Sequence, residues 1–259
     1  MSPLSFGMGS ARAFGFKTPP VVATGVVEKV IGTNLPSVPT STATVDTGFA
    51  KSIFYDPATP SNTAITGLPA SFSNSGYYMN TRSGSWTIEY QFYHADLANA
   101  STKGPFMCLR GYETTQRMEF GSTASATQAS PQVTFFNGGS AATFNGNSFS
   151  STNYFNQNAW NHFAIVFVEG QFKMFANGAA VGFTLSADNY GIAIPADFLD
   201  NTPITLGAQF PTSFPRFRGY ISQVRISSIA RYPLAQNTYT APSGPFALDA
   251  STQLLIQPV

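Results

Sequence analysis

The stretch WNHFAIVFVEGQFKMFANGAAVG, residues 160–182, constrains the fold more than any other part of the chain. It consists of three apolar runs separated by two short turn signals, Glu169-Gly170 and Asn177-Gly178. Asn-Gly between apolar runs favours a two-residue type I′ turn, because both central residues of that turn need positive φ. The stretch therefore predicts consecutive antiparallel strands, with Trp160 and His162 at the opening of the first hairpin.

Short runs rich in Val, Ile, Phe, Tyr and Thr, bounded by turn clusters, continue on both sides of this stretch and predict further strands. No segment keeps a 3.6-residue apolar period, and residues 195–200 are the one place for a single helical turn. The chain is therefore predicted to be all-β. The expected strands are residues 51–55, 77–81, 85–93, 104–110, 117–121, 132–137, 161–168, 171–176, 179–185, 203–208, 218–227 and 252–257.

Alternation within two of these runs predicts how their side chains divide between faces. In 85–93, apolar Ile88, Tyr90 and Phe92 alternate with a second set, Thr87, Glu89, Gln91 and Tyr93. In 218–227, a strict alternation sets Ile221, Gln223, Arg225 and Ser227 opposite Tyr220, Ser222, Val224 and Ile226. Strands with one core face and one half-buried face predict two packed antiparallel sheets, a sandwich.

Composition excludes several classes of partner. Charged residues are 10% of the chain, against about 25% in typical soluble domains, so neutral polar residues must cover the surface, part of which is expected to be covered by neighbours in an assembly. A net charge of +1 provides no basic field for DNA or RNA. No apolar run is long enough to predict membrane insertion. Cys108 is the only cysteine, so no intrachain disulfide is expected, and the N-terminal text lacks the apolar core of a signal peptide.

Residues 1–47 differ from the rest and predict an extended N-terminal arm. They are punctuated by Gly, Pro, Ser and Thr, with one short β-like run at 21–31. Aromatic side chains spaced among glycines suit docking into a partner. The expected docking residues are Phe6, Arg12, Phe14 and Phe16, with the alternative that the phenylalanines fold back on the chain's own core.

The hairpin text, taken with SNSGYYMNTRSGSWTIEYQFY, ITLGAQ, FRGYISQVRISSIARY and PFALDASTQLLIQ in this order, resembles the laminin-G-like branch of the concanavalin-A-like lectin/glucanase superfamily. The resemblance covers roughly residues 48–259 and implies a two-sheet antiparallel jelly-roll sandwich with the arm in front of it. In that family the Trp-x-His text opens a core hairpin. The resemblance thus implies that Trp160 packs at the sandwich edge and that His162 bonds a backbone carbonyl.

No catalytic constellation is visible in the sequence. Glycoside hydrolases of this superfamily carry acidic residues that alternate along one strand, whereas Glu89 and Glu119 each stand alone on theirs. His94 has no second His and no Cys nearby, so a zinc site is not expected. The chain is therefore predicted not to be an enzyme.

Two binding sites remain open from the residues. Calcium is the one cofactor left open, with Asp188 (next to Asn189) and Asp200 (next to Asn201) as weak ligand candidates, although such pairs more often form turns. A glycan site would need an aromatic platform with polar partners on loops, unless the same aromatics pack under their own loops or against a neighbour. Its candidates are Tyr112, Asn189, Tyr190, Phe214 and Arg216.

The short Gly-rich ARAFGF text, residues 11–16, together with such a sandwich resembles structural proteins of tailed phages. This resemblance implies a non-enzymatic virion protein on the outer surface of the particle, as a capsid decoration, head fibre or tail component. Its partners would be other virion proteins, itself as a homotrimer, and a host-surface glycan. The alternative is a carbohydrate-binding adhesin of a tail fibre or spike whose main role is receptor recognition.

Overall fold

A computed structural model describes the chain over a set of separate ranges. These are residues 26–30, 53–55, 63–65, 84–94, 105–109, 116–122, 131–137, 140–145, 154–156, 158–169, 171–186, 204–206 and 219–258. All the regular structure in them is β-strand, as the sequence predicted. None of these ranges contains a helix long and apolar enough to cross a bilayer.

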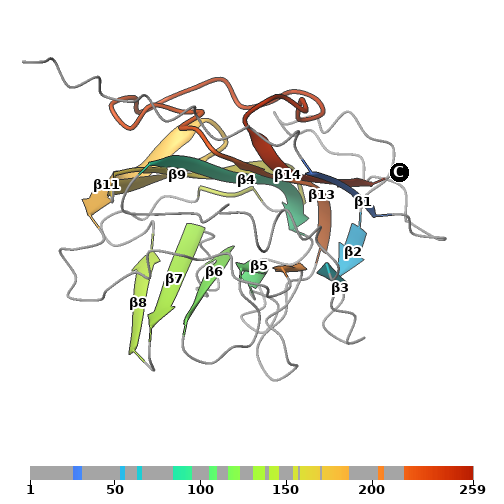
Figure 1. The fold of residues 1–259 in the computed structure, drawn as a ribbon, viewed down its shortest axis with the longest axis horizontal. Coiled ribbons are helices and arrows are strands. Elements are labelled where there is room, and N and C mark those ends of the chain that lie inside the picture. The colour runs from blue at the N-terminus through green and yellow to red at the C-terminus, as the bar shows by residue number, and fades with distance from the viewer. Residues whose placement is uncertain are drawn as a thin grey trace, which may run out of the picture.

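The strands form two antiparallel layers, apart from one parallel pair, and this architecture is the predicted sandwich (Figure 1). The 8-stranded sheet has the order β1-β14-β13-β4-β9-β10-β11, with β2 also on β13, and the 6-stranded sheet has the order β3-β12-β5-β6-β7-β8. The strands of the larger sheet are β1 (Val26–Val30), β2 (Ile53–Tyr55), β4 (Ser85–His94), β9 (Trp160–Val168), β10 (Gln171–Ala176), β11 (Ala179–Ser186), β13 (Gly219–Ser227) and β14 (Thr252–Pro258). Those of the smaller sheet are β3 (Thr63–Ile65), β5 (Pro105–Leu109), β6 (Gln116–Ser122), β7 (Pro131–Asn137), β8 (Ser140–Asn145) and β12 (Ile204–Leu206).

Aromatic side chains of β4 and β9 form the centre of the core on the inner face of the larger sheet. Tyr90 and Phe163 lie on paired positions, and their ring centroids are 5.0 Å apart. Phe92 meets the ring of Phe155 edge-on at 4.8 Å. All four side chains are almost completely buried, and burying a large apolar side chain contributes about 1.5–3 kcal/mol. This core is what the alternation of Ile88, Tyr90 and Phe92 predicted.

The Asn177-Gly178 turn has the predicted conformation, with φ of 50° and 86°. The Asn177 side chain also fixes the start of β9. Its Oδ1 accepts a hydrogen bond from the backbone N–H of His162 at 2.9 Å, and its Nδ2 donates to the carbonyl of Tyr154 at 3.1 Å. The turn therefore joins β10 to β11 and at the same time braces the opening of the first hairpin.

The predicted alternation of β13 is wrong at one end, because the strand contains a β-bulge. Gln223 pairs with Gln91, but Ile221 pairs with Phe92, with Ser222 as the extra residue between them. A one-residue shift moves side chains to the opposite face. Ile221 consequently shares the core face with Phe92 instead of the face of Gln223.

The outer face of the larger sheet is also covered, so the expected half-buried face is wrong for the centre of the sheet. Residues 228–251, here called the strap, cross above this face on the side away from the smaller sheet (Figure 1). Glu89 and Gln91 of β4 are 0% exposed beneath it. The strap's contacts with the sheet, described below, show why polar residues can be buried there.

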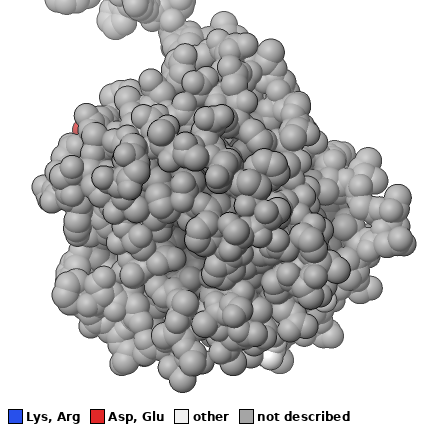
Figure 2. Space-filling model, turned by 90° about the horizontal axis from the view of Figure 1, so that it is seen from below, with Lys and Arg blue, Asp and Glu red and all other residues white. Residues whose placement is uncertain are grey.

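Residues 26–30, inside the expected arm, are part of the larger sheet. β1 pairs in parallel with β14, from Val26 opposite Leu254 to Val30 opposite Pro258. The rest of the range 1–47 lies outside the described residues, and the domain boundary at residue 47 stays a prediction. The face on the side of the smaller sheet is formed in Figure 2 almost wholly by residues that are not described.

Candidate functional site

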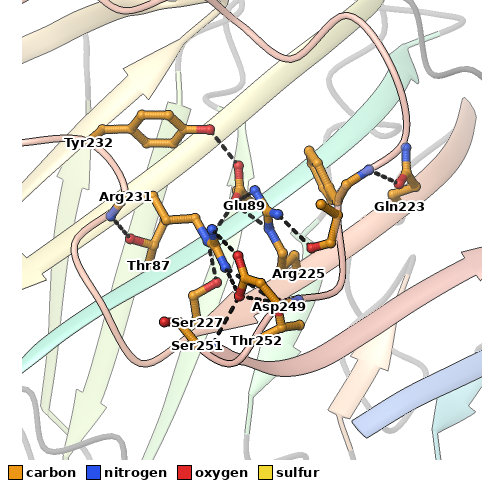
Figure 3. A network of polar contacts seen from close by, with 12 residues as sticks. Thr87, Glu89, Gln223, Arg225, Ser227, Arg231, Tyr232, Asp249, Ser251 and Thr252 are labelled. Carbon is orange, nitrogen blue, oxygen red and sulfur yellow. Dashed lines mark hydrogen bonds and ion pairs between the residues drawn. The ribbon is translucent and has the colours of Figure 1, made fainter. Parts of the chain in front are cut away.

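The most concentrated chemistry among the described residues is a polar network beneath the strap, centred on Glu89 (Figure 3). Its members come from neighbouring strands of the larger sheet because the cross-strand register aligns them. Glu89 of β4 is opposite Arg225 of β13, and Gln91 is opposite His162 of β9. All four therefore point to the outer face of the sheet.

The carboxylate of Glu89 is fully satisfied by donors from the sheet and the strap. Its Oε1 accepts from Arg225, at 2.8 Å from Nε and 2.6 Å from Nη2. Its Oε2 accepts from His162 Nε2 at 3.0 Å and from the hydroxyl of Tyr232 at 2.7 Å. Arg231 Nε lies 3.7 Å from Oε1. A buried carboxylate needs such partners, since an unpaired buried charge costs several kcal/mol.

The surroundings of Glu89 set its protonation. Burial raises the pKa of this carboxyl, but the hydrogen bond and charge of His162 and the charge of Arg225 outweigh it and hold the pKa below its usual value. Glu89 therefore stays ionised in the folded protein at neutral pH. The network is an ionic one, not a neutral hydrogen-bonded cluster.

His162 links Glu89 to a second tyrosine of the strap. A carboxylate only accepts, so Nε2 of His162 carries a proton toward Glu89. The hydroxyl of Tyr239 forms a hydrogen bond with the other ring nitrogen, Nδ1, at 2.6 Å. Tyr232 and Tyr239 stack with ring centroids 3.8 Å apart, and their hydroxyls reach inward to Glu89 and His162 respectively.

The expectation that His162 bonds a backbone carbonyl is therefore wrong: both ring nitrogens bond side chains, those of Glu89 and Tyr239. Glu89 is the one acidic residue of β4, as the sequence shows, but it is paired with donors from β9, β13 and the strap. Trp160 is framework, as expected, and is 3% exposed. Its ring contacts Tyr93 edge-on at 5.8 Å, in a cluster that includes Ala241 of the strap.

Further polar side chains of the sheet hold the rest of the strap by its backbone. Lys173 Nζ donates to the carbonyls of Leu234 and Gln236 at 2.9 and 2.8 Å and to Oδ1 of Asn237 at 2.8 Å. Arg225 Nη1 donates to the carbonyl of Ala247 at 3.0 Å. These bonds replace the water that strap carbonyls would otherwise need.

Two more contacts close the strap at its ends. Gln223 Oε1 accepts the backbone N–H of Phe246 at 2.7 Å. Arg231 forms a two-pronged pair with Asp249, at 2.9 and 2.8 Å, which ties one end of the strap to the other. The strap is thus attached along its length by polar side chains of the sheet and by its own Arg231–Asp249 pair.

The chain Tyr239–His162–Glu89 has the connectivity of a nucleophile, a base and an orienting acid. It lacks the accessibility that such a triad needs. Glu89 and His162 are each 0% exposed, and the strap closes the face above them. Burial is the largest cause that raises the pKa of the Tyr239 hydroxyl well above its usual value, and the charges of the neighbouring Tyr232 and Glu89 raise it further. The hydroxyl therefore stays protonated. The arrangement fastens the strap over Glu89 and His162.

None of the candidate ligand residues from the sequence can be placed. The arm residues Phe6, Arg12, Phe14 and Phe16, the glycan candidates Tyr112, Asn189, Tyr190, Phe214 and Arg216, and the calcium candidates Asp188 and Asp200 all lie outside the described residues. Within the described ranges, no three His, Cys, Asp or Glu side chains are grouped to hold a metal ion. The Arg-Tyr pair at 231–232 was visible as a family feature, but its role in the network was not.

The network gives a testable dependence of stability on alkaline pH. Tyr239 ionises near its ordinary pKa of about 10 in the unfolded chain, whereas the folded protein keeps its proton because the pKa is raised. The stability that the buried Tyr239 hydroxyl contributes is fully present below pH 10. Above it, the unfolded state releases a proton that the folded state holds, so stability falls by up to about 1.4 kcal/mol per pH unit. Urea unfolding from pH 7 to 11 should show a shallower decline for Tyr239→Phe. An unchanged slope would contradict the buried hydroxyl.

A two-layer antiparallel sandwich with an opening Trp-x-His hairpin defines a lectin-like β-sandwich class. The chain belongs to the Laminin_G_3 family, described as "Concanavalin A-like lectin/glucanases superfamily", whose profile matches residues 69–234. The matched range includes the opening hairpin and the start of the strap as far as Leu234. No curated protein matches the chain significantly.

Several solved structures are similar to this chain, at low identity and with TM-scores below 0.5. Domains LG4-5 of the mouse laminin alpha1 chain are 9% identical with a TM-score of 0.47, covering 78% of this chain and 48% of that chain. The Ruminococcus gnavus IT-sialidase CBM40 bound to alpha2,3 sialyllactose is 13% identical with a TM-score of 0.38, covering 54% and 74%. Tailspike protein 2 of the Escherichia coli O157:H7 bacteriophage CAB120 is 14% identical with a TM-score of 0.39, covering 74% and 27%. This chain thus spans about half of the laminin chain it matches.

Proposed function

We propose that this chain is a non-enzymatic structural protein on the outer surface of a phage particle, as a capsid decoration, head fibre or tail component. The observation that carries the non-enzymatic part is the burial of Glu89 and His162, each 0% exposed, under the strap. The acid–base cluster of Glu89 and His162 among the described residues thereby stabilises the sandwich and is closed off from solvent. The sandwich then acts as a rigid body that cements neighbours or displays a surface.

The placement on a particle rests on the composition and the N-terminal sequence. A charged fraction of 10% suits a surface covered by neighbouring subunits, including copies of this chain as a homotrimer. The Gly- and Phe-containing text before β1 suits attachment to other virion proteins. Because β1 begins at Val26, the attachment segment that leaves the sandwich intact is residues 1–24.

Deleting residues 1–24 tests the attachment. The deletion leaves β1 and the sheet intact, so the urea midpoint should stay within error of the full chain. We expect occupancy on the particle, measured by quantitative mass spectrometry, to fall at least about ten-fold. A matched variant with Phe6→Ala, Phe14→Ala and Phe16→Ala keeps the chain length and separates side-chain docking from loss of length. Normal occupancy of the deleted chain would rule out residues 1–24 as the anchor.

The second candidate is a carbohydrate-binding adhesin, favoured by membership of a lectin superfamily. A glycan array separates it from a purely structural role. Micromolar binding to one glycan class, lost in Tyr112→Ala or Tyr190→Ala but kept in the arm deletion, would favour recognition as the main role. Turnover of any polysaccharide in a panel by the intact, folded chain would overturn the non-enzymatic proposal.

A further inference from the structure

Among the described strands, β1 lies at the edge of the larger sheet and pairs with one neighbour. It occupies the end of the strand order, and β14 is its hydrogen-bonded partner. The pairing is parallel over five positions, Val26 to Val30. The described part of this attachment is a five-position backbone ladder, which any chain with the same sequence can supply.

The end of β1 and the start of β2 are almost adjacent in the sheet. Val30 is opposite Pro258, at the end of β14. β14 and β2 both pair antiparallel with β13, so they run in the same direction. β14 lies along β13 from Val224 onward, and β2 lies along β13 from Gly219 to Ile221. Because β4 occupies the other edge of β13, β14 and β2 share one edge. With strands spaced about 4.8 Å apart, Val30 and Ile53 are separated by roughly 10 Å.

The link between these two points is far longer than this gap requires. About three to four residues would bridge roughly 10 Å, since each extended residue spans about 3.3 Å. The chain instead places residues 31–52, which is 22 residues, between β1 and β2. Fully extended, this link reaches roughly 70 Å, enough to cross to the same edge of a neighbouring molecule.

We propose that β1 is exchanged between copies of this chain, so that β1 of one copy pairs with β14 of the next. The exchanged ladder is the same one that the single chain forms, Val26 opposite Leu254 to Val30 opposite Pro258, so exchange loses no backbone pairing. The long link makes exchange sterically possible. A neighbouring copy held in an assembly supplies a high local concentration of β14 edges. The charge-poor surface does not repel a second copy. This inference rests on the assembly of copies in the proposed function, whether or not the particle is a phage.

Two single-cysteine chains test the exchange directly. Lys29 and Gln257 are register partners, and neither belongs to the network under the strap. In a Cys108→Ser background, one chain carries Lys29→Cys and a second, tagged chain carries Gln257→Cys. Neither can close a disulfide within itself between these strands. The chains are mixed unfolded, refolded together, oxidised and analysed on a non-reducing gel.

We expect the disulfide between the two unlike chains to form in a large fraction of molecules, at least about ten-fold more than in a control. The control pairs Lys29→Cys with Ser243→Cys, a position exposed on the strap and out of register with β1. Equal and low yields in both mixtures would overturn the proposal. So would a double variant, Lys29→Cys with Gln257→Cys in one chain, that yields only monomers closed within themselves at every protein concentration.

Shortening the link provides a second, independent measurement. Deleting residues 34–47 leaves eight residues between β1 and β2, enough for pairing within a chain, and cuts the extended reach of the link from roughly 70 Å to roughly 26 Å. We expect the shortened chain to remain folded and to shift from oligomer to monomer in sedimentation velocity. Oligomers that survive the deletion with unchanged mass would show that another contact, not β1, joins the copies.

Discussion

Replacing Glu89 by glutamine is expected to lower the free energy of unfolding by about 3–5 kcal/mol, the range for breaking a buried ion pair by removal of one partner. The substitution keeps the shape of the side chain and removes its charge. Arg225, whose side chain is 8% exposed, is then left without a counterion, and Arg231 loses the carboxylate 3.7 Å from its Nε. Tyr232 also loses the charge that its hydroxyl bonds. Urea unfolding at pH 7, followed by tryptophan fluorescence, measures the loss.

The matched control for this variant is Asp249→Asn, because it breaks an ion pair of the same strap that faces water. Asp249 has a side chain that is 42% exposed and bonds Arg231, whereas Glu89 is 0% exposed. Exposed pairs typically contribute about 0–1 kcal/mol. Glu89→Gln should therefore cost several times more than Asp249→Asn. Similar small losses for both would mean that the strap is held by its apolar contacts and not by the ionic network.

The strands that could be predicted from sequence are those whose signal is local. β9, β10 and β11 have continuous apolar runs, and the Asn177-Gly178 turn between the last two has its own chemical signature. β3 and β8 were not predicted. β3 is three residues long, and β8, with the sequence SAATFN, is rich in small residues. The bulge at Ser222 was invisible because it depends on how β13 meets its neighbours and not on its own alternation.

The polar network could not be predicted, because it depends on contacts between distant parts of the chain. Glu89 meets His162 across 73 residues and Tyr232 across 143 residues. In the sequence, Glu89 and Gln91 alternate with apolar neighbours, which is also the pattern of a water-facing strand. Only the path of the strap separates the two cases, and an irregular segment such as residues 228–251 carries no periodic signal. The candidate arm, glycan and calcium residues lie outside the described part of the chain, so they stay predictions.

The strap should be sensitive to a single methyl group at Gly178. This residue has a φ of 86°, and a Cβ on it would collide with the backbone carbonyl oxygen of Tyr239. The strap is tied to the hairpin at this point, since the N–H of Tyr239 donates to the carbonyl of Gly178 at 2.8 Å and the N–H of Ala180 donates to that of Asn237 at 2.8 Å. Neither backbone can move away without breaking these bonds.

Gly178→Ala is therefore expected to lower the free energy of unfolding by about 2–4 kcal/mol. Of this, roughly 1 kcal/mol comes from a side chain at positive φ and about 1–3 kcal/mol from the collision. Gly182→Ala isolates the first part, because Gly182 has a φ of 74° and an added Cβ there meets nothing within 4 Å. Urea unfolding gives both costs. Trypsin cleavage after Arg231, which lies in the strap, reports the local effect and should be faster only in Gly178→Ala. If the two alanine variants lost equal stability and were cut at equal rates, the collision with Tyr239 would not be what makes glycine necessary at 178.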